Sequence, residues 1–440
     1  MTAEVAILNK YAVALAADSA ATRADAQKVF SAHKLFQLSR YHPIGVMIYG
    51  SNEFMGVPYE TIIKFYRSKL GLVELPTLTA YAEHFLNFLA SARFSQRESI
   101  EYNVGRIVRS TFSGLANAVQ RSIVGVLGAD ENKKVSGRIL RELADAAIET
   151  ALDEMKRSTA ESDHFRTLSD LKGEFKHIIE HEAKSRFERF GVKKETLKRL
   201  IELALLVLAT DRFSEIRSGI VVAGFGQEEL LPSIVSYVSD GIIGGGVHKI
   251  IDGAKQRISL DMESAIVPFA QPDMVYRFME GIDRKFEVSL ESDIKRLLNQ
   301  FSVELAARFF EKHRARGGFE LEVADMIQNL ANNFTTQIKE KKYKEFALPI
   351  LNIVKSLPKE ELGSFAEALV SLTSLKRRVS LDQETVGGPV DVAVISKGDG
   401  FIWIKRKHYF NMNLNPQYSL RVNAANSDGV PELPEMDDAK

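Results

Sequence analysis

The chain of 440 residues contains no cysteine. Disulfide bonds, thiolate zinc sites and a cysteine nucleophile are therefore excluded. The chain also lacks an excess of either charge, because 58 lysines and arginines are balanced by 58 aspartates and glutamates. No global charge therefore favours nucleic acid or an anionic membrane as a partner.

Long apolar segments are missing as well. No apolar run reaches the roughly 18 residues that a membrane-spanning helix needs. The first residues also lack a charged segment followed by an apolar core, which is the pattern of a signal peptide. We therefore expect a cytoplasmic protein. The glycines at 244–246 lack the spacing of a nucleotide-binding loop and predict a turn, so the sequence predicts no cofactor.

The informative stretch is the first fifty residues. Apolar runs at 5–8 and 11–17 are separated by Asn9 and Lys10, which predicts a buried hairpin. The second run ends at Asp18, and a third run at 44–49 ends at Gly50. Lys34 lies between them, so an acid, a base and a glycine stand near the ends of predicted strands.

Thr2 directly follows the initiator methionine. Removal of Met1 is expected because residue 2 is small, and it would leave Thr2 with both a hydroxyl and a free α-amine. No propeptide would then need to be cleaved. An α-amine has a pKa of about 7.7 to 8, so much of it can accept a proton near neutral pH. A threonine activated by its own amine is a known nucleophile.

These residues together resemble a known family. The order Thr2, then 15–19 (Leu-Ala-Ala-Asp-Ser), then Lys34, then Gly50 is similar to the proteasome β-subunit group of N-terminal-nucleophile hydrolases, in its bacterial proteasome-related form with large helical insertions. Asp18 and Lys34 stand 16 and 32 residues after Thr2, as in that family. The resemblance implies an α+β protein with a four-layer αββα sandwich.

The resemblance also implies an activity and a site. It implies a threonine-type peptidase or amidohydrolase that cleaves amide bonds through an acyl-enzyme on Thr2. Lys34 would stabilise the Thr2 alkoxide and keep the amine unprotonated by charge repulsion, and Asp18 would hold Lys34 charged. The backbone N–H of Gly50 would bind the oxyanion. A peptide or protein is the implied substrate, and a homo-oligomer and an unfoldase or other protein are candidate partners.

Two parts of the family pattern differ here. An Asp-x-x-Ser precedes the late Gly-Gly in the family, whereas Gln383 and Val386 occupy those positions in this chain. The family's Gly-Ser-Gly before a helix is replaced by a segment in which Gln271 could offer a polar group to the amine. The support of the Thr2 amine must therefore be rebuilt, or the activity is reduced.

Periodicity along the rest of the chain predicts its organisation. Helical spacing dominates 97–212 and 290–355, whereas strand patterns recur at 218–225, 233–238, 247–251 and 390–405. We divide the chain into three core parts, two helical insertions and a partly disordered C-terminal tail. The core parts are 1–96, 213–286 and 358–407, the insertions are 97–212 and 287–357, and the tail is 408–440.

Two alternatives remain open at this stage. The first is a catalytically weak or inactive scaffold with the same fold, which acts as an interaction module through its helical insertions. The second is a zinc hydrolase, because His177 and His181 with Glu180 match a His-x-x-Glu-His pattern. Charged neighbours of these histidines are equally typical of a solvated helix, so we expect no metal.

Overall fold

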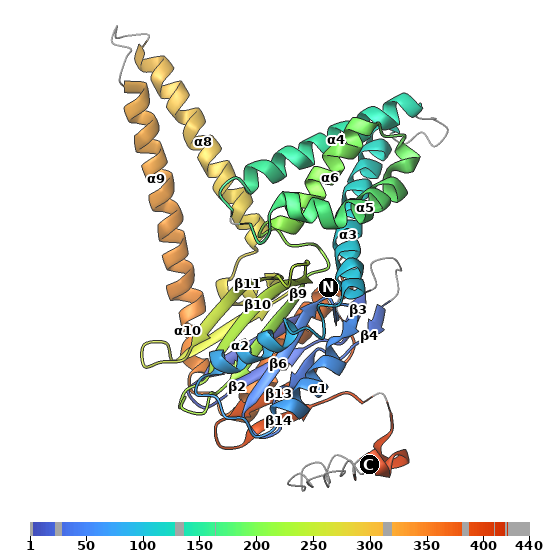
Figure 1. Ribbon diagram of the computed structural model, residues 1–440. Helices are drawn as coiled ribbons and strands as arrows, with labels where there is room; N and C mark the ends of the chain where they lie inside the picture. The colour runs from blue at the N-terminus through green and yellow to red at the C-terminus, as the bar shows by residue number, and fades with distance from the viewer. Residues whose placement is uncertain are drawn as a thin grey trace, which may run out of the picture.

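The computed structural model describes residues 3–22, 29–127, 136–162, 164–310, 319–380, 387–408, 410–418 and 420. Two five-stranded sheets lie at its centre, and their strands pair in antiparallel fashion. Helices flank the sheets and project away from them (Figure 1). The α+β class predicted from the sequence is confirmed.

The first sheet contains both the first and the last of the described strands. Its strands are β1 (Glu4–Asn9), β2 (Val13–Ala17), β12 (Ser264–Phe269), β13 (Asp391–Ser396) and β14 (Gly400–Lys405). They are ordered β12-β1-β2-β13-β14.

The second sheet is ordered β11-β10-β9-β6-β5. Its strands are β5 (Leu35–Gln37), β6 (Ile44–Gly50), β9 (Ser218–Gly224), β10 (Ser233–Ile242) and β11 (His248–Arg257). Two short hairpins, β3 (Ala20–Thr22) with β4 (Val29–Ser31) and β7 (Glu53–Phe54) with β8 (Val57–Pro58), lie outside these sheets.

The predicted N-terminal hairpin is formed by β1 and β2. Its turn lies one residue later than the sequence break suggested, and Asn9 is the reason. The Asn9 side-chain oxygen accepts hydrogen bonds from the amides of Tyr11 (2.9 Å) and Ala12 (3.2 Å), which closes the turn. Its amide nitrogen donates to the carbonyls of Val354 (3.0 Å) and Leu357 (2.9 Å). One buried side chain therefore shapes the hairpin and attaches it to a distant helix.

The two central sheets share an apolar core. Ala6 and Leu8 of β1 face the same cluster as Met47 of β6 and Val221 of β9. The alternate residues Val5 and Ile7 face the opposite cluster, which is formed with helices. Every residue of β1 is buried, which explains why its middle residues, 5–8, are continuously apolar rather than alternating.

Helices cover the outer faces of the sheets. Helices α1 (Tyr59–Leu70) and α2 (Leu78–Leu89) contribute to one apolar cluster with the outer face of the second sheet. Helices α7 (Asp273–Glu280), α10 (Leu348–Val354) and α11 (Lys359–Arg378) contribute to another with the outer face of the first sheet.

A separate helical lobe follows α2. Its helices are α3 (Arg97–Leu127), α4 (Gly137–Ser158), α5 (Leu168–Phe187) and α6 (Lys194–Ala209), with the 3-10 turn η1 (Glu188–Phe190). They bury their own apolar cluster, in which Phe112 and Phe187 meet edge to face. Ile148 and Leu152, which belong to the helical stripe expected from the sequence, are buried in α4.

A buried ion pair joins this lobe to the second sheet. The ammonium of Lys249 lies 3.4 Å from a carboxylate oxygen of Asp240, and both side chains are almost fully buried. Lys249 also donates to the carbonyls of Val207 and Arg212, and Asp240 accepts from the amide (2.9 Å) and hydroxyl (2.7 Å) of Ser214. Because each charge has several partners, the cost of burying it is offset.

A second helical projection is formed by α8 (Arg284–Phe310) and α9 (Phe319–Lys342), which lie beside each other. The π-helical segment η2 (Tyr343–Ala347) continues α9 into α10. Figure 1 shows this pair and the α3–α6 lobe leaving the sheets toward the same side of the view. The 3-10 turn η3 (Met412–Leu414) lies beyond the last strand, and residues 421–440 of the predicted tail lie outside the described residues.

Two elements differ from the sequence interpretation. The helix expected from Glu53 begins only at Tyr59, because Gly56 adopts a left-handed φ of 80° and Pro58 precedes the first turn. Strand β12, which contains Pro268, was not among the strands predicted from the sequence. Proline lacks an N–H, but β12 is an edge strand of the first sheet, where a missing donor is tolerated.

Candidate active site

The candidate residues gather where strands of both sheets end. Ala3 precedes β1, Asp18 follows β2 and Gly387 precedes β13, so all three lie at one end of the first sheet. Lys34 precedes β5, and Gly50 is the last residue of β6 in the second sheet. The site is therefore built from both sheets.

Asp18 is the centre of this arrangement. Its Oδ1 accepts a hydrogen bond from the Lys34 ammonium at 2.7 Å and from the amide of Ala3 at 3.0 Å. Its Oδ2 accepts from the amides of Gly387 (2.9 Å) and Ala20 (3.3 Å). The Asp18 carboxylate thereby ties the beginning of β1, the segment before β13 and a lysine of the second sheet to one point.

Lys34 is buried with its partner. The side chains of Lys34 and Asp18 are 6% and 0% exposed, and the ammonium also donates to the Ala20 carbonyl. An exposed pair of this kind would contribute only about 0 to 1 kcal/mol. Because this pair is removed from water, the Lys34 charge depends on the Asp18 carboxylate, and loss of that carboxylate is costly.

Gly50 lies close to Lys34 through the second sheet. The amide of Ile48 donates to the Lys34 carbonyl at 2.9 Å, and Gly50 is two residues further along β6, or about 7 Å of strand. Gly50 adopts a φ of 77°, and a Cβ added there would lie 2.1 Å from the carbonyl oxygen of Arg217. The position therefore requires glycine for two independent reasons.

We predict that Gly50→Ala lowers the free energy of unfolding by about 3 kcal/mol, since it combines left-handed strain with a backbone clash. Gly71→Ala is the matched control, because Gly71 also has a positive φ (52°) but has no atom within 4 Å of an added Cβ. It should cost only about 1 to 2 kcal/mol. Urea unfolding measures both, and equal losses in the two variants would contradict the role of the clash.

Other candidate residues differ in how far the structure describes them. Thr2, Gln383 and Val386 lie outside the described residues. Gln271 is buried, and its side-chain oxygen accepts a hydrogen bond from the guanidinium of Arg377 at 2.6 Å. It stands two residues after Phe269, which pairs with Glu4 in the β1–β12 register, so Gln271 lies at the same end of the first sheet as Asp18.

The structure adds Glu4, which the sequence analysis did not single out. Glu4 is 2% exposed, and within the described part of the chain neither of its carboxyl oxygens has a hydrogen-bond partner. Burial raises its pKa to about 8, the Lys34 charge opposes the increase and the Asp18 charge adds to it. The sequence offered one signal for this residue: Glu4 alternates with Ala6 and Leu8, which face the core between the sheets, so a charged side chain was placed on a buried face.

The raised pKa of Glu4 predicts a pH dependence of stability. Between pH 5 and 8 the folded chain holds a proton on Glu4 that the unfolded chain releases, so unfolding becomes more favourable as pH rises. Glu4→Gln removes this penalty. Relative to the wild type, the variant should gain about 1 kcal/mol of unfolding free energy for each pH unit between pH 6 and 8.

Urea unfolding of both proteins at pH 6, 7 and 8 measures this difference. Glu98→Gln, which changes an exposed glutamate of α3, is the control and should follow the wild type at each pH. Parallel curves for Glu4→Gln and the wild type would show that Glu4 does not titrate in this range.

A second polar group borders the site. Asp391, at the start of β13, is buried and lies 3.8 Å from His33 and 4.0 Å from the ammonium of Lys407. It also accepts the Lys407 amide hydrogen bond at 2.8 Å. Burial lowers the pKa of Lys407, Asp391 opposes that change and Lys34 adds to it. The sheets thus carry two adjacent lysine–aspartate pairs at this end.

The zinc alternative finds no support in the described part of the chain. His177 and His181 lie exposed on α5. Within the described ranges, no three histidine, aspartate or glutamate side chains come together as metal ligands. Over the same ranges, no helix has the length and apolar character needed to cross a bilayer.

Comparisons with known proteins yield only weak structural similarities. No family model matches the chain, and no curated protein sequence matches it. Solved structures that align with it include Anbu (ancestral beta-subunit) from Yersinia bercovieri, with a TM-score of 0.24 and 9% identity over 98% of both chains. Anbu from Hyphomicrobium sp. strain MC1 aligns with a TM-score of 0.24 and 10% identity, covering 98% of this chain and 99% of the other.

These results correct the family assignment made from the sequence. Membership in the proteasome β-subunit group is wrong as an assignment, because no family model matches and the structural similarity is too weak to establish a shared fold. The motifs that carried the resemblance amount to a few residues at strand ends. Such constellations recur on unrelated folds, so they do not establish common descent.

Proposed function

We propose that this chain is an N-terminal threonine hydrolase that cleaves amide bonds, with peptides as the substrate class. The observation that carries the proposal is the double role of Asp18. Its Oδ1 binds both the Lys34 ammonium and the amide of Ala3, the residue that follows Thr2. A buried cation is thereby held beside the beginning of the chain, where an N-terminal nucleophile would need it.

The proposed reaction uses the residues in defined roles. The Thr2 hydroxyl oxygen attacks the carbonyl carbon of the substrate, and its proton passes to the Thr2 amine directly or through a water. The protonated amine then gives that proton to the leaving nitrogen, which departs as the first product. Water hydrolyses the resulting ester on Thr2, and the acid is released.

Lys34 and Gly50 contribute electrostatically. The Lys34 ammonium lowers the cost of forming negative charge on the Thr2 oxygen and disfavours a proton on the Thr2 amine. The N–H of Gly50 would donate to the oxyanion of the tetrahedral intermediate, and one such donor contributes about 2.7 to 4 kcal/mol in known enzymes. Gly50 lies on β6, two residues after Ile48, whose amide donates to the Lys34 carbonyl.

We interpret the surrounding architecture as an αββα sandwich of the N-terminal-nucleophile type. Support comes from the shared core between the two sheets and from the helical clusters on their outer faces. In this interpretation the α3–α6 lobe and the α8–α9 pair are insertions into the core. The ranges 97–212 and 287–357 remain the proposed boundaries of these insertions.

Covalent labelling tests the proposal. The full chain is incubated with a peptide epoxyketone, which reacts with both the hydroxyl and the amine of an N-terminal threonine, and the intact mass is measured. We expect loss of Met1 and addition of one inhibitor per chain at Thr2, with no addition in Thr2→Ala. A retained Met1, or labelling that persists in Thr2→Ala, would refute the N-terminal nucleophile.

An inactive scaffold is the second candidate. It is favoured by the large apolar side chains exposed on the α8–α9 pair, which include Phe286, Val288, Leu297, Phe301 and Leu330. Exposed apolar side chains of this size are common at protein interfaces. Absence of labelling together with a retained Met1 would favour this function.

A further inference from the structure

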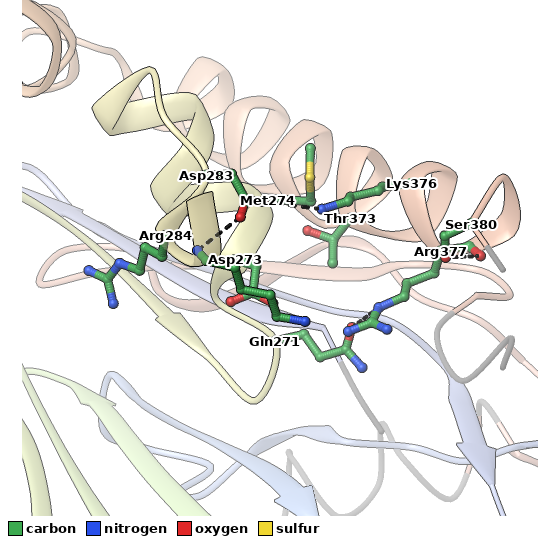
Figure 2. A pocket seen from close by; sticks show the side chains of 10 residues that line it. Gln271, Asp273, Met274, Asp283, Arg284, Thr373, Lys376, Arg377 and Ser380 are labelled. Carbon is green, nitrogen blue, oxygen red and sulfur yellow. Dashed lines mark hydrogen bonds and ion pairs between the residues drawn. The ribbon is translucent and has the colours of Figure 1, made fainter. Parts of the chain in front are cut away.

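A small cavity lies between the helices that cover the first sheet. It has a volume of about 60 Å³ and is lined by residues of α7, the start of α8 and the last turns of α11. Liquid water occupies about 30 Å³ per molecule, so the cavity is large enough for a carboxylate group. Figure 2 shows Lys376 extending from α11 toward Asp283, and Arg377 extending toward Gln271.

Among the described residues, the lining of this cavity carries more basic than acidic side chains. Four basic side chains, Arg284, Lys285, Lys376 and Arg377, contribute to it against Asp273 and Asp283, and Arg284 also pairs with Glu280 at 3.3 Å. The Asp283 carboxylate is already engaged, because it pairs with Arg277 and accepts the amides of Lys285 (2.9 Å) and Phe286 (3.3 Å). The Lys376 ammonium is 3.9 Å from Asp283, which is longer than a hydrogen bond.

The charge of Lys376 is therefore poorly compensated. Burial lowers its pKa, and repulsion from Arg277, Arg377 and Lys285 adds to the decrease, whereas Asp273 opposes it. A bound anion would relieve this repulsion. Carboxylates suit the cavity better than apolar groups, because ammonium and guanidinium groups form strong charge-assisted hydrogen bonds with them.

The cavity lies at the same end of the first sheet as the candidate active site. Gln271 lines it and stands two residues after Phe269, the partner of Glu4. Gln271 therefore places this edge of the cavity at the end of the first sheet where β1 begins.

We propose that this cavity is a subsite for a substrate carboxylate, so that the protein selects acidic peptides. That the bound carboxylate belongs to a substrate rests on the proposed threonine hydrolase activity. Binding of a carboxylate in the cavity does not depend on that activity. The carboxylate can come from an aspartate or glutamate side chain or from the C-terminus of the peptide. Experiments can separate these two sources.

Binding of short peptides to the full-length Thr2→Ala chain tests this inference without turnover. Three acetylated tetrapeptides are compared by calorimetry: Ala-Ala-Ala-Glu amide, Ala-Ala-Ala-Gln with a free C-terminus, and Ala-Ala-Ala-Gln amide. We expect at least one of the two charged peptides to bind about tenfold more tightly than the neutral one. The tighter charged peptide identifies the source of the carboxylate. Equal affinity of all three peptides, or no binding of any, would refute the subsite.

Two variants locate the effect in the cavity. Lys376→Gln and Lys285→Gln should each reduce the preference for the charged peptide to less than threefold, and Lys285 is exposed, so that its replacement should not impair folding. Lys172→Gln on α5 removes an equally exposed lysine and should keep the full preference. A preference that survives both cavity variants would refute the assignment. A preference without any peptide cleavage by the wild type would refute the hydrolase and leave the subsite intact.

Discussion

Lys34→Met is expected to abolish most of the hydrolytic activity while leaving the fold intact. We predict a decrease in kcat of about 10³-fold, which corresponds to about 4 kcal/mol in the activation barrier. The reason is that methionine keeps the length of the side chain but removes the charge that would stabilise the Thr2 alkoxide. Hydrolysis of a peptide library by both proteins measures the effect.

The fold should tolerate this change because Asp18 retains other donors. The amides of Ala3, Ala20 and Gly387 still donate to its carboxylate when Lys34 is absent. Lys397→Met is the matched control, since Lys397 also donates to two backbone carbonyls, those of Gly226 (2.7 Å) and Gln227 (2.8 Å), away from the candidate site. Wild-type kcat in Lys34→Met, or an equal loss in Lys397→Met, would contradict the role of Lys34.

Asp18→Asn is expected to destabilise the protein much more than Lys34→Met does. The variant removes the negative charge that compensates the buried Lys34 ammonium and leaves it only neutral acceptors among the described residues, such as the Ala20 carbonyl. It also turns an acceptor of four hydrogen bonds into a group that carries its own donors. Breaking a buried ion pair by removing one partner costs about 3 to 5 kcal/mol, which is a large fraction of the 5 to 15 kcal/mol typical of a domain.

Chemical denaturation of the two proteins at pH 7 measures this loss. Glu182→Gln is the matched control. The Glu182 side chain is also buried, at 7% exposed, but its partner Arg109 is 51% exposed and can return to water. That variant should lose only about 1 kcal/mol. A free energy of unfolding for Asp18→Asn within about 1 kcal/mol of the wild type would show that the pair is not as buried as the structure has it.

The order of stability between the two site variants is informative in itself. Lys34→Met removes the buried positive charge that requires a partner. Asp18→Asn keeps that positive charge buried and removes the carboxylate that compensates it. Activity should fall in both variants, but stability should fall mainly in Asp18→Asn. This asymmetry separates a role of Lys34 in chemistry from a purely structural ion pair.

Much of this protein could be predicted from local patterns. The hairpin of β1 and β2, the apolar stripes of α4 and α6 and the glycine turn after β6 follow from periodicity and turn residues within a few positions. Asp18 and Gly50 were found because each stands at the end of an apolar run, whereas Lys34 was found by its spacing from Thr2 in the family resemblance. The α+β class was predicted through the family resemblance, and the two antiparallel sheets with their flanking helices agree with that class.

Other features depend on segments that are far apart in the chain. The register of β12 against β1, the ion pair of Asp18 with Lys34 across two sheets, the burial of Glu4 and the cavity between α7 and α11 all require the assembled fold. A sequence pattern states which face of a segment is apolar, but it does not state which other segment covers that face. The sequence alone therefore determined the elements and the types of groups at their ends, whereas tertiary packing decided which of those groups meet, because burial and pairing of charges are properties of contacts between distant segments.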